Sequence, residues 1–308
     1  MDVVVPGEGI VHLTNQHFKT RGGEGDVYFK GQTVYKIYFD HKAAPPAAKM
    51  QELAVLKHPQ IVVPDQPIFN SRQNKLVGFT MRRLDDVEPL CKLFTKAFRQ
   101  RQKISDRDVL ALVKQLHDLI SFIHQHHILV VDLNELNFLL GGDKLFAIDT
   151  NSYQTPSFPA TAIMPHIADV HCGNKFSETT DWFSFGIVSF QMFTGIHPYK
   201  GTNPDFDDIP KDGRLLERMR RNVSVLNSKT TVPAICQLSV IPQGLLAWYA
   251  AVFEGGKRLN PPDNYEVSAV QIITPLRSIP VSGGFTIRQI FQFDSEIIDV
   301  VCDAGNCI

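Results

Sequence analysis

The sequence lacks paired cysteines, long apolar runs and a recognisable leader. Its five cysteines are scattered, odd in number and nowhere spaced as Cys-x-x-Cys. This usage fits a reducing compartment better than a disulfide framework. No apolar run approaches the ~20 residues that a membrane span requires. The N-terminus, Met-Asp-Val-Val-Val-Pro, also lacks the basic region and apolar core of a signal peptide. We therefore expect a cytoplasmic protein that does not engage a membrane.

The chain also lacks an excess of charge of either sign. Lysine and arginine together number 31, and aspartate and glutamate 32. This balance gives no reason to expect nucleic acid as a partner. Apolar residues make up 44% of the 308 residues, so a substantial core can form. The length allows one large two-lobed domain or two ordinary ones.

The most informative stretch runs from Ile128 to Ser152. Two apolar runs are joined by a Gly-Gly-Asp turn, which predicts a β-hairpin. Asp132, Asn137 and Asp149 stand on this hairpin among apolar residues, where a carboxylate is costly unless a cation or hydrogen bonds meet it. Two aspartates and an asparagine are hard oxygen ligands of the kind that Mg²⁺ uses.

A second hairpin is rich in glycine and comes near the N-terminus. Gly22, Gly23 and Gly25 precede a β-type run, and Lys36 lies in the middle of the next run, 33–39. Glycines let a backbone approach a phosphate closely and aim N–H groups at it. A lysine in an otherwise apolar strand requires an anion, unless the hairpin is on the surface and the lysine faces water.

The remaining patterns predict a small antiparallel sheet followed by a helical region. A helix is expected within 43–57, with Glu52 on an edge from which it could reach Lys36. The runs 61–64, 67–69 and 76–81 together predict two further strands. A long loop is expected at 152–180, and β-type runs are expected at 267–274, 284–291 and 297–302. A long helix is expected from Ser105, which with Asp108 resembles a capping box, to about His127. A second helix is expected at 180–193, with Asp181 as its cap and its end near Gly195. Two more helices are expected at 215–225 and 245–252.

Over roughly residues 10–265, these motifs resemble the protein kinase family. The stretch 20–27 resembles the nucleotide loop, with Thr20 in place of its first glycine, and 34–37 resembles the strand motif that carries the phosphate-binding lysine, here Lys36. Glu52 stands about where the family has the glutamate that pairs with this lysine. The other matching stretches are 56–62, the catalytic loop 131–138, 148–151 in place of Asp-Phe-Gly, 181–186 and 193–199.

The resemblance implies an α+β, bilobal kinase-like fold. Residues 1–84 would form an N-lobe with an antiparallel sheet and one main helix, and 85–265 a mostly helical C-lobe. Residues 266–308 would form a β-rich extension, a candidate fragment of a further domain and a candidate surface for a partner. The pattern is more similar to divergent bacterial or phage kinases than to animal ones.

The implied activity is Mg²⁺-dependent transfer of the ATP γ-phosphoryl group to Ser/Thr hydroxyls of a protein substrate. Asp132 would be the catalytic base, Lys36 with Glu52 would hold the phosphates, and Asn137 with Asp149 would bind Mg²⁺. The resemblance assigns the nucleotide contacts to Gly22, Gly23, Gly25, Val27, Lys36, Met81, Asn137 and Asp149.

Several positions depart from the family pattern. Val130 and Val131 replace the usual His-Arg before Asp132. Without that arginine, a phosphorylated residue within 152–180 has no obvious partner, so we expect that such phosphorylation does not switch the activity on. Asn134 replaces the catalytic-loop lysine, and Thr150-Asn151 replaces Phe-Gly. The Ala-Pro-Glu element is poorly matched, and Asp169 is its nearest counterpart, with Arg258 as a candidate partner. Two alternatives therefore stay open: an ATP-binding pseudokinase that acts as a scaffold, and a small-molecule kinase of the same broad fold.

Overall fold

The computed structural model describes residues 1–72, 74–161, 163–173 and 175–265, together with four short strands nearer the C-terminus. The chain divides into two compact units, Met1–Val267 and Ser268–Ile308. In the second unit, β11 (Ser278–Pro280) pairs with β12 (Thr286–Arg288), and β13 (Cys302–Asp303) pairs with β14 (Asn306–Cys307). The predicted run at 267–274 lies outside the described residues, and so does all of the run at 297–302 except its last residue.

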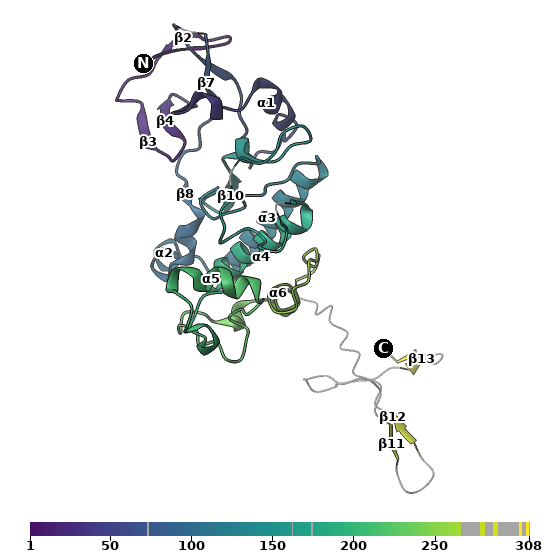
Figure 1. Ribbon diagram of the computed structural model, residues 1–308. Helices are drawn as coiled ribbons and strands as arrows, with labels where there is room; N and C mark the ends of the chain where they lie inside the picture. The colour runs from purple at the N-terminus through teal and green to yellow at the C-terminus, as the bar shows by residue number, and fades with distance from the viewer. Residues whose placement is uncertain are drawn as a thin grey trace. The chain divides into compact units, whose positions relative to one another are not determined.

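A seven-stranded antiparallel sheet forms the N-terminal part of the first unit (Figure 1). Its spatial order is β2-β1-β6-β7-β5-β4-β3. The strands are β1 (Asp2–Val5), β2 (Gly9–His12), β3 (Phe18–Arg21), β4 (Gly25–Lys30), β5 (Thr33–Tyr38), β6 (Pro67–Asn70) and β7 (Leu76–Arg82). This sheet confirms the predicted antiparallel arrangement at the N-terminus, with a helical region after it.

Strand β5 lies between β4 and β7 and carries Lys36. Its sequence, Thr-Val-Tyr-Lys-Ile-Tyr, consists mainly of β-branched and aromatic residues, which pack well on a pleated surface. Gly78 of β7 allows the close approach of the two strands, because a Cβ there would lie 1.9 Å from the carbonyl oxygen of Lys36. The position of Lys36 is therefore set by backbone packing on both sides of β5.

Helices dominate the part of the first unit that follows the sheet. The long helix α3 begins after Ser105, which forms a capping box with Asp108 as predicted, and α4 ends at Gly195, whose φ of 75° is left-handed. Helices α3 and α4 lie side by side in Figure 1 and share the main apolar core. The α-helices are α1 (Ala47–Leu53), α2 (Lys96–Gln102), α3 (Asp106–Gln125), α4 (Glu178–Thr194), α5 (Lys211–Arg220) and α6 (Gln243–Phe253). The 3₁₀ helices are η1 (His41–Ala43), η2 (Leu90–Phe94), η3 (Thr150–Ser152), η4 (Pro204–Phe206) and η5 (Leu238–Val240).

A small second sheet carries the hairpin expected between 128 and 149. It consists of β8 (Glu88–Pro89), β9 (Phe138–Gly141) and β10 (Lys144–Ala147), in the order β10-β9-β8. The hairpin itself is confirmed, but the run 128–131 is not one of its strands. In that run, Leu129 makes only an isolated bridge, to Gln154.

Three other predicted elements differ from the structure. The helix expected at 215–225 is α5, which begins earlier and ends at Arg220. The segment 61–64 is not a strand: Ile61 makes one isolated parallel bridge to Ala147. Prolines at 59 and 64 lack the N–H groups that a longer ladder would use. The helix expected within 43–57 is only the seven-residue α1, which starts after Pro46.

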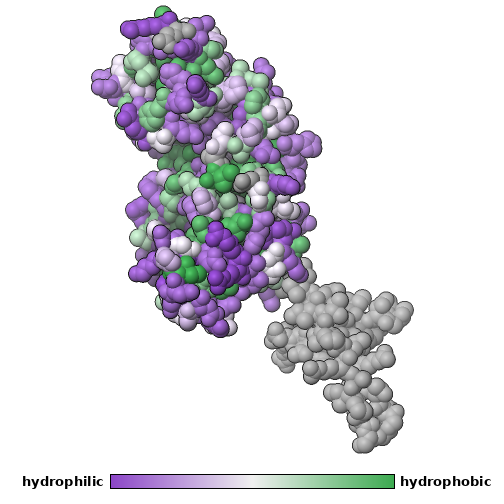
Figure 2. Space-filling view, viewed as in Figure 1, coloured by the Kyte–Doolittle hydropathy of each residue, from purple (hydrophilic) through white to green (hydrophobic). Residues whose placement is uncertain are grey.

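No helix in the described part of the chain is long and apolar enough to cross a bilayer. Figure 2 shows a largely hydrophilic face of the first unit, with apolar side chains in small separate patches. Most of the large apolar side chains described are instead in the core, and Phe183, Phe185 and Phe190 of α4 are at most 1% exposed. The predicted buried character of this helix is confirmed.

Buried His197, just after α4, predicts a pH dependence of stability. Its Nε2–H donates to the carbonyl of His166, its Nδ1 accepts from the backbone N–H of Tyr199, and burial lowers its pKa to about 3. The unfolded chain has an ordinary histidine there and binds more protons below about pH 6.5, so His197 lowers stability progressively as pH falls from 6.5 toward 3. From pH 6.5 to pH 5 this costs about 2 kcal/mol of unfolding free energy.

The measurement is urea unfolding at pH 7, 6 and 5. His197→Gln keeps a donor and an acceptor but does not titrate, so it should lose about 2 kcal/mol less than the wild type across this range. His41→Gln, a change at an exposed histidine, is the control and should follow the wild type. Equal pH slopes for wild type and His197→Gln would contradict the assignment.

Candidate active site

The hairpin β9–β10 brings the three predicted oxygen-bearing residues together. Asn137 precedes β9 and Asp149 follows β10, and the N–H of Ile148 donates to the carbonyl of Asn137 at 2.9 Å. Asn137 Nδ2 donates to the backbone oxygen of Asp132 at 2.9 Å and to its Oδ2 at 3.2 Å. Three side chains from separate points on the chain are therefore held in one cluster.

Asp132 is 5% exposed and surrounded by hydrogen-bond donors. Besides Asn137, its Oδ2 accepts from Asn134 Nδ2 at 2.8 Å, and its Oδ1 accepts from the backbone N–H of Met164 at 2.9 Å. Burial raises the pKa of Asp132 above its usual value, despite the opposing effect of these hydrogen bonds, and the nearby charge of Asp149 adds to the rise. A carboxyl with a raised pKa and aligned donors is suited to accept a proton.

Asn137 and Asp149 present oxygen atoms that can bind a metal ion. The amide nitrogen of Asn137 is used by Asp132, and no described residue donates to its Oδ1. Asp149 is 32% exposed at its side chain and uses Oδ1 to accept from Lys36. One amide oxygen and one carboxylate suit Mg²⁺, which takes few protein ligands and completes its shell with phosphates and water.

Lys36 reaches this cluster from β5. Its Nζ lies 2.6 Å from Asp149 Oδ1 and 3.1 Å from Glu24 Oε2, and its side chain is 11% exposed. Burial alone would lower the pKa of Lys36, but Asp149, Tyr38 and Glu24 outweigh it and raise the pKa above its usual value. Lys36 is therefore charged at neutral pH, next to the groups that could bind a metal ion.

The predicted pair between Lys36 and Glu52 is not formed. Glu52 Oε2 instead accepts from the backbone N–H of Ser157 at 3.2 Å. Helix α1 turns Lys49 into the interior, where its Nζ donates to the carbonyl of Pro159. The segment around Ser157 thus lies against α1 and provides Glu52 with a hydrogen-bond donor. Glu24 contacts Lys36 in the position that was predicted for Glu52.

The glycine-rich turn joins β3 to β4 beside the same strand. The N–H of Gly22 donates to the carbonyl of Gly25 at 2.9 Å and closes the turn. A Cβ at Gly25 would lie 2.2 Å from the carbonyl oxygen of Ile37, so only glycine fits there. Gly23 has no atom within 4 Å of the place where a Cβ would lie. This open space would allow a ligand to come close to the turn.

Val27 and Met81 lie on the same sheet face as Lys36. Val27 is paired with Lys36 across β4 and β5, and Met81 is paired with Val34 across β7 and β5. Directly paired residues and residues two apart point to one face of a sheet. The sequence-predicted nucleotide contacts on the sheet therefore share a face.

The backbone before Asp132 is held in an unusual conformation. Val131 has φ of 61°, a left-handed value that is strained for a β-branched residue. The fully buried carboxylate of Asp181 accepts from the N–H groups of Val130 and Val131, at 2.7 and 2.8 Å, and from His124 Nε2 at 2.9 Å. Asp181 therefore holds the backbone of the loop that leads to Asp132, and the N-cap residue of α4 is Ser177 instead.

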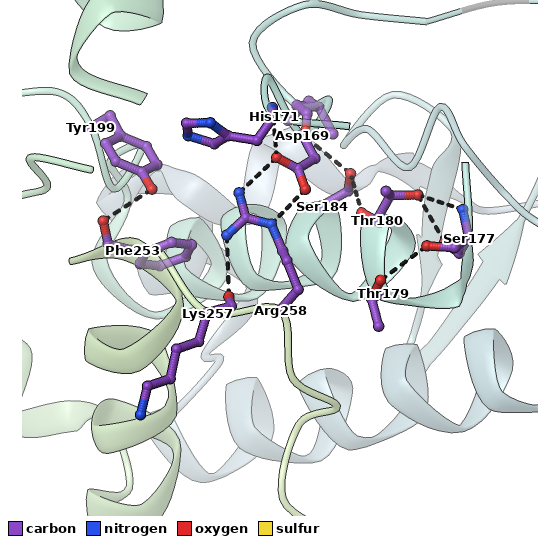
Figure 3. Close-up of polar contacts among 11 residues, drawn as sticks. Asp169, His171, Ser177, Thr179, Thr180, Ser184, Tyr199, Phe253, Lys257 and Arg258 are labelled. Atoms are coloured by element: carbon purple, nitrogen blue, oxygen red, sulfur yellow. Dashed lines mark hydrogen bonds and ion pairs between the residues drawn. The ribbon is translucent and has the colours of Figure 1, made fainter. Parts of the chain in front are cut away.

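The predicted contact between Asp169 and Arg258 is confirmed. Arg258 Nε and Nη2 donate to the two carboxylate oxygens of Asp169 at 2.5 and 2.6 Å (Figure 3). Asp169 is 3% exposed at its side chain, yet the hydrogen bonds from Arg258 and His171 outweigh burial and hold its pKa below the usual value. This ion pair connects the segment between η3 and α4 to the chain after α6.

The segment that follows Asp149 is also anchored at its start, within η3. Thr150 Oγ1 donates to the carbonyl of Val62 at 2.9 Å, and Asn151 Nδ2 donates to the hydroxyl of Tyr38 at 3.0 Å. The positions that replace Phe-Gly therefore connect the segment after β10 to the chain at Val62 and to strand β5. Sequence reasoning did not assign the roles of Glu24, Met164 and His124, because their partners are more distant in sequence or the group that bonds belongs to the backbone. It also did not assign the contact of Asn134 with the nearby carboxylate of Asp132.

A metal site built from several acidic, histidine or cysteine side chains is absent from the part of the chain that the structure describes. No cluster of three or more His, Cys, Asp or Glu suited to a metal occurs there. A cavity of about 390 Å³ at the end of α4, lined by residues such as Arg99, Phe193 and Ile235, contains none of the cluster residues. The site is therefore defined by side-chain chemistry and not by this cavity.

Comparison with known proteins finds distant homology to protein kinases. The chain is 24% identical over 203 residues to "Protein kinase YegI" of Escherichia coli O157:H7, covering 59% of this chain, and 25% identical over 209 residues to the same-named protein of strain K12. It is also 27% identical over 119 residues, 33% of its length, to "Serine/threonine-protein kinase 17A" of Oryctolagus cuniculus, of which 28% is covered. The match spans 31% of each YegI protein. No protein-family model matches the chain.

Proposed function

We propose that this chain, a distant homologue of protein kinases, transfers the γ-phosphoryl group of ATP to a Ser or Thr hydroxyl of a protein. The observation that carries the proposal is the joint placement of Lys36, Asp132, Asn137 and Asp149 at the hairpin β9–β10. In this proposal residues 1–84 are the N-lobe and 85–265 the C-lobe of a bilobal kinase fold. Three of the five cysteines, Cys91, Cys172 and Cys236, are free, which agrees with the reducing, cytoplasmic location that is part of this proposal.

Each residue has a separate task in the proposed reaction. Lys36 binds the α/β-phosphates through its charge, and the turn that contains Gly22 and Gly25 covers them with backbone N–H groups. Asn137 and Asp149 hold Mg²⁺, which neutralises charge on the phosphates when bound. The acceptor hydroxyl takes the place of the Met164 N–H at Asp132 Oδ1.

The bonds change at two oxygen atoms. The acceptor oxygen forms a new bond to the γ-phosphorus while the bond from that phosphorus to the β–γ bridging oxygen breaks, and ADP leaves with the bridging oxygen. The hydroxyl proton passes to Asp132. Because such a transition state requires little covalent participation by the protein, positioning and charge stabilisation account for most of the catalysis.

One observation favours a second candidate, an ATP-binding pseudokinase. The N–H of Met164 occupies Asp132 Oδ1, and Glu24 occupies Lys36, so both functional groups have internal partners. A module that binds nucleotide without turnover could have the same arrangement. The replacement of the family's catalytic-loop lysine by Asn134 agrees with this alternative.

Incubation with γ-labelled ATP, Mg²⁺ and generic protein substrates distinguishes the candidates. The proposal expects label on phosphoserine or phosphothreonine. Nucleotide-dependent thermal stabilisation without transfer would favour the pseudokinase. Transfer to a metabolite mixture but never to protein would favour a small-molecule kinase.

A further inference from the structure

Glu24 is a charged residue of the glycine-rich turn to which the proposed reaction gives no role. Its Oε2 lies 3.1 Å from Lys36 Nζ, so the buried lysine contacts two carboxylates, Glu24 and Asp149. Asp149 comes from the hairpin that bears the candidate metal ligands. Glu24 comes from the loop that would cover the phosphates, and this difference in origin suggests a different role.

The backbone of the turn places Glu24 over Lys36. The N–H of Phe39, just after β5, donates to the carbonyl of Glu24 at 2.9 Å. The neighbouring Gly25 lies so close to the carbonyl of Ile37 that no side chain fits between them. Glu24 is thus fixed at its main chain beside β5, and its side chain extends to the lysine of that strand.

A carboxylate in this position resembles a phosphate oxygen. Both are anionic hydrogen-bond acceptors, and an ammonium group binds either as a point charge. We propose that Glu24 is an internal competitor of the nucleotide phosphates: its carboxylate occupies Lys36 in the nucleotide-free protein and leaves when the phosphates bind. This inference rests on the proposed nucleotide site and adds a residue that sets its affinity for phosphates.

The distances of the two acids from Lys36, and their other contacts, indicate which one leaves. Glu24 is 40% exposed at its side chain, and its single ion pair can be exchanged for water. Asp149 is closer to Lys36, at 2.6 Å, and stays in contact with the metal and the lysine in the proposed complex. The negative charge of Glu24 therefore opposes phosphate binding, and its removal should strengthen it.

Equilibrium binding of ADP with Mg²⁺, and of adenosine, tests the inference. Glu24→Gln keeps the side-chain shape and removes the charge, so we expect ADP to bind about tenfold more tightly. Adenosine has no phosphate and should bind as it does to the wild type. Asp40→Asn is the matched control. It removes one exposed negative charge just after β5, and asparagine can still cap η1. It should leave both affinities unchanged.

The outcomes separate the inference from the proposed function. If the wild type binds ADP and Glu24→Gln binds it equally or more weakly, Glu24 is not a competitor and the inference is wrong. Equal tightening of adenosine would also overturn it, because the change would then not act on phosphate. If neither folded protein binds ADP, the proposed nucleotide site fails and the inference fails with it. Equal ADP affinities of Lys36→Met and Glu24→Gln/Lys36→Met would show that the effect of Glu24→Gln acts through Lys36, whereas a tenfold difference between them would overturn the inference.

Discussion

Asp132→Asn is expected to lower the rate of phosphoryl transfer by about a thousandfold, within the usual range for loss of a general base. Asparagine cannot take the hydroxyl proton, although it has nearly the same size. Binding of ADP should persist, because Lys36 and the glycine-rich turn are unchanged. The measurement is the single-turnover transfer rate beside the dissociation constant for ADP.

The control for this change lies in the same hairpin. Asp143→Asn alters an exposed turn residue between β9 and β10 and should leave the rate near that of the wild type. Urea unfolding of both variants checks that the hairpin stays folded. A near-normal rate for Asp132→Asn would mean that Asp132 is not the base.

Arg258→Met is expected to lower the free energy of unfolding by about 3–5 kcal/mol, because it leaves the carboxylate of Asp169 buried without its cation. Methionine keeps the apolar stem of the side chain, so lost packing contributes little. Arg258 also stacks on the ring of Phe183, with its guanidinium carbon 4.4 Å from the centroid, and this contact is lost as well.

A double-mutant cycle isolates the charge pair from other effects. Asp169→Asn/Arg258→Met removes both charges and should recover a large part of the stability lost in Arg258→Met. Chemical denaturation of the wild type, both single variants and the double variant measures the coupling. If the two single losses simply add, the bidentate pair visible in Figure 3 contributes little to stability.

The parts of the site that could be predicted from the sequence depend on local pattern. The hairpin with Asn137 and Asp149 follows from two apolar runs and a Gly-Gly-Asp turn. The contact between Asp169 and Arg258 also agrees with the resemblance to kinases, although the two residues are distant in the chain. In these cases, residue type and order identify the partners well.

The pairing at Lys36 could not be predicted in this way. Glu52 has a suitable position in sequence, but the backbone N–H of Ser157 takes its carboxylate. Glu24 reaches Lys36 because Gly25 packs on the backbone of β5, and that fit depends on three-dimensional contact. Backbone partners such as the N–H of Met164 have no signature in the identity of their residue.

The role of Asp181 shows the same limit. Its position near the start of α4 suggested a helix cap, which is a local interaction. The structure instead connects it to His124 and to the N–H groups of Val130 and Val131, and these bonds hold the left-handed backbone before Asp132. Strain of this kind appears only when the whole loop is seen.

The most direct test of the central claim is a structure of the protein with Mg²⁺ and a non-hydrolysable ATP analogue. The account predicts one metal ion bound by Asn137 Oδ1 and the carboxylate of Asp149, with Lys36 on the phosphates and Glu24 displaced from Lys36. A nucleotide bound elsewhere, or a metal ion that Asn137 and Asp149 do not share, would contradict it.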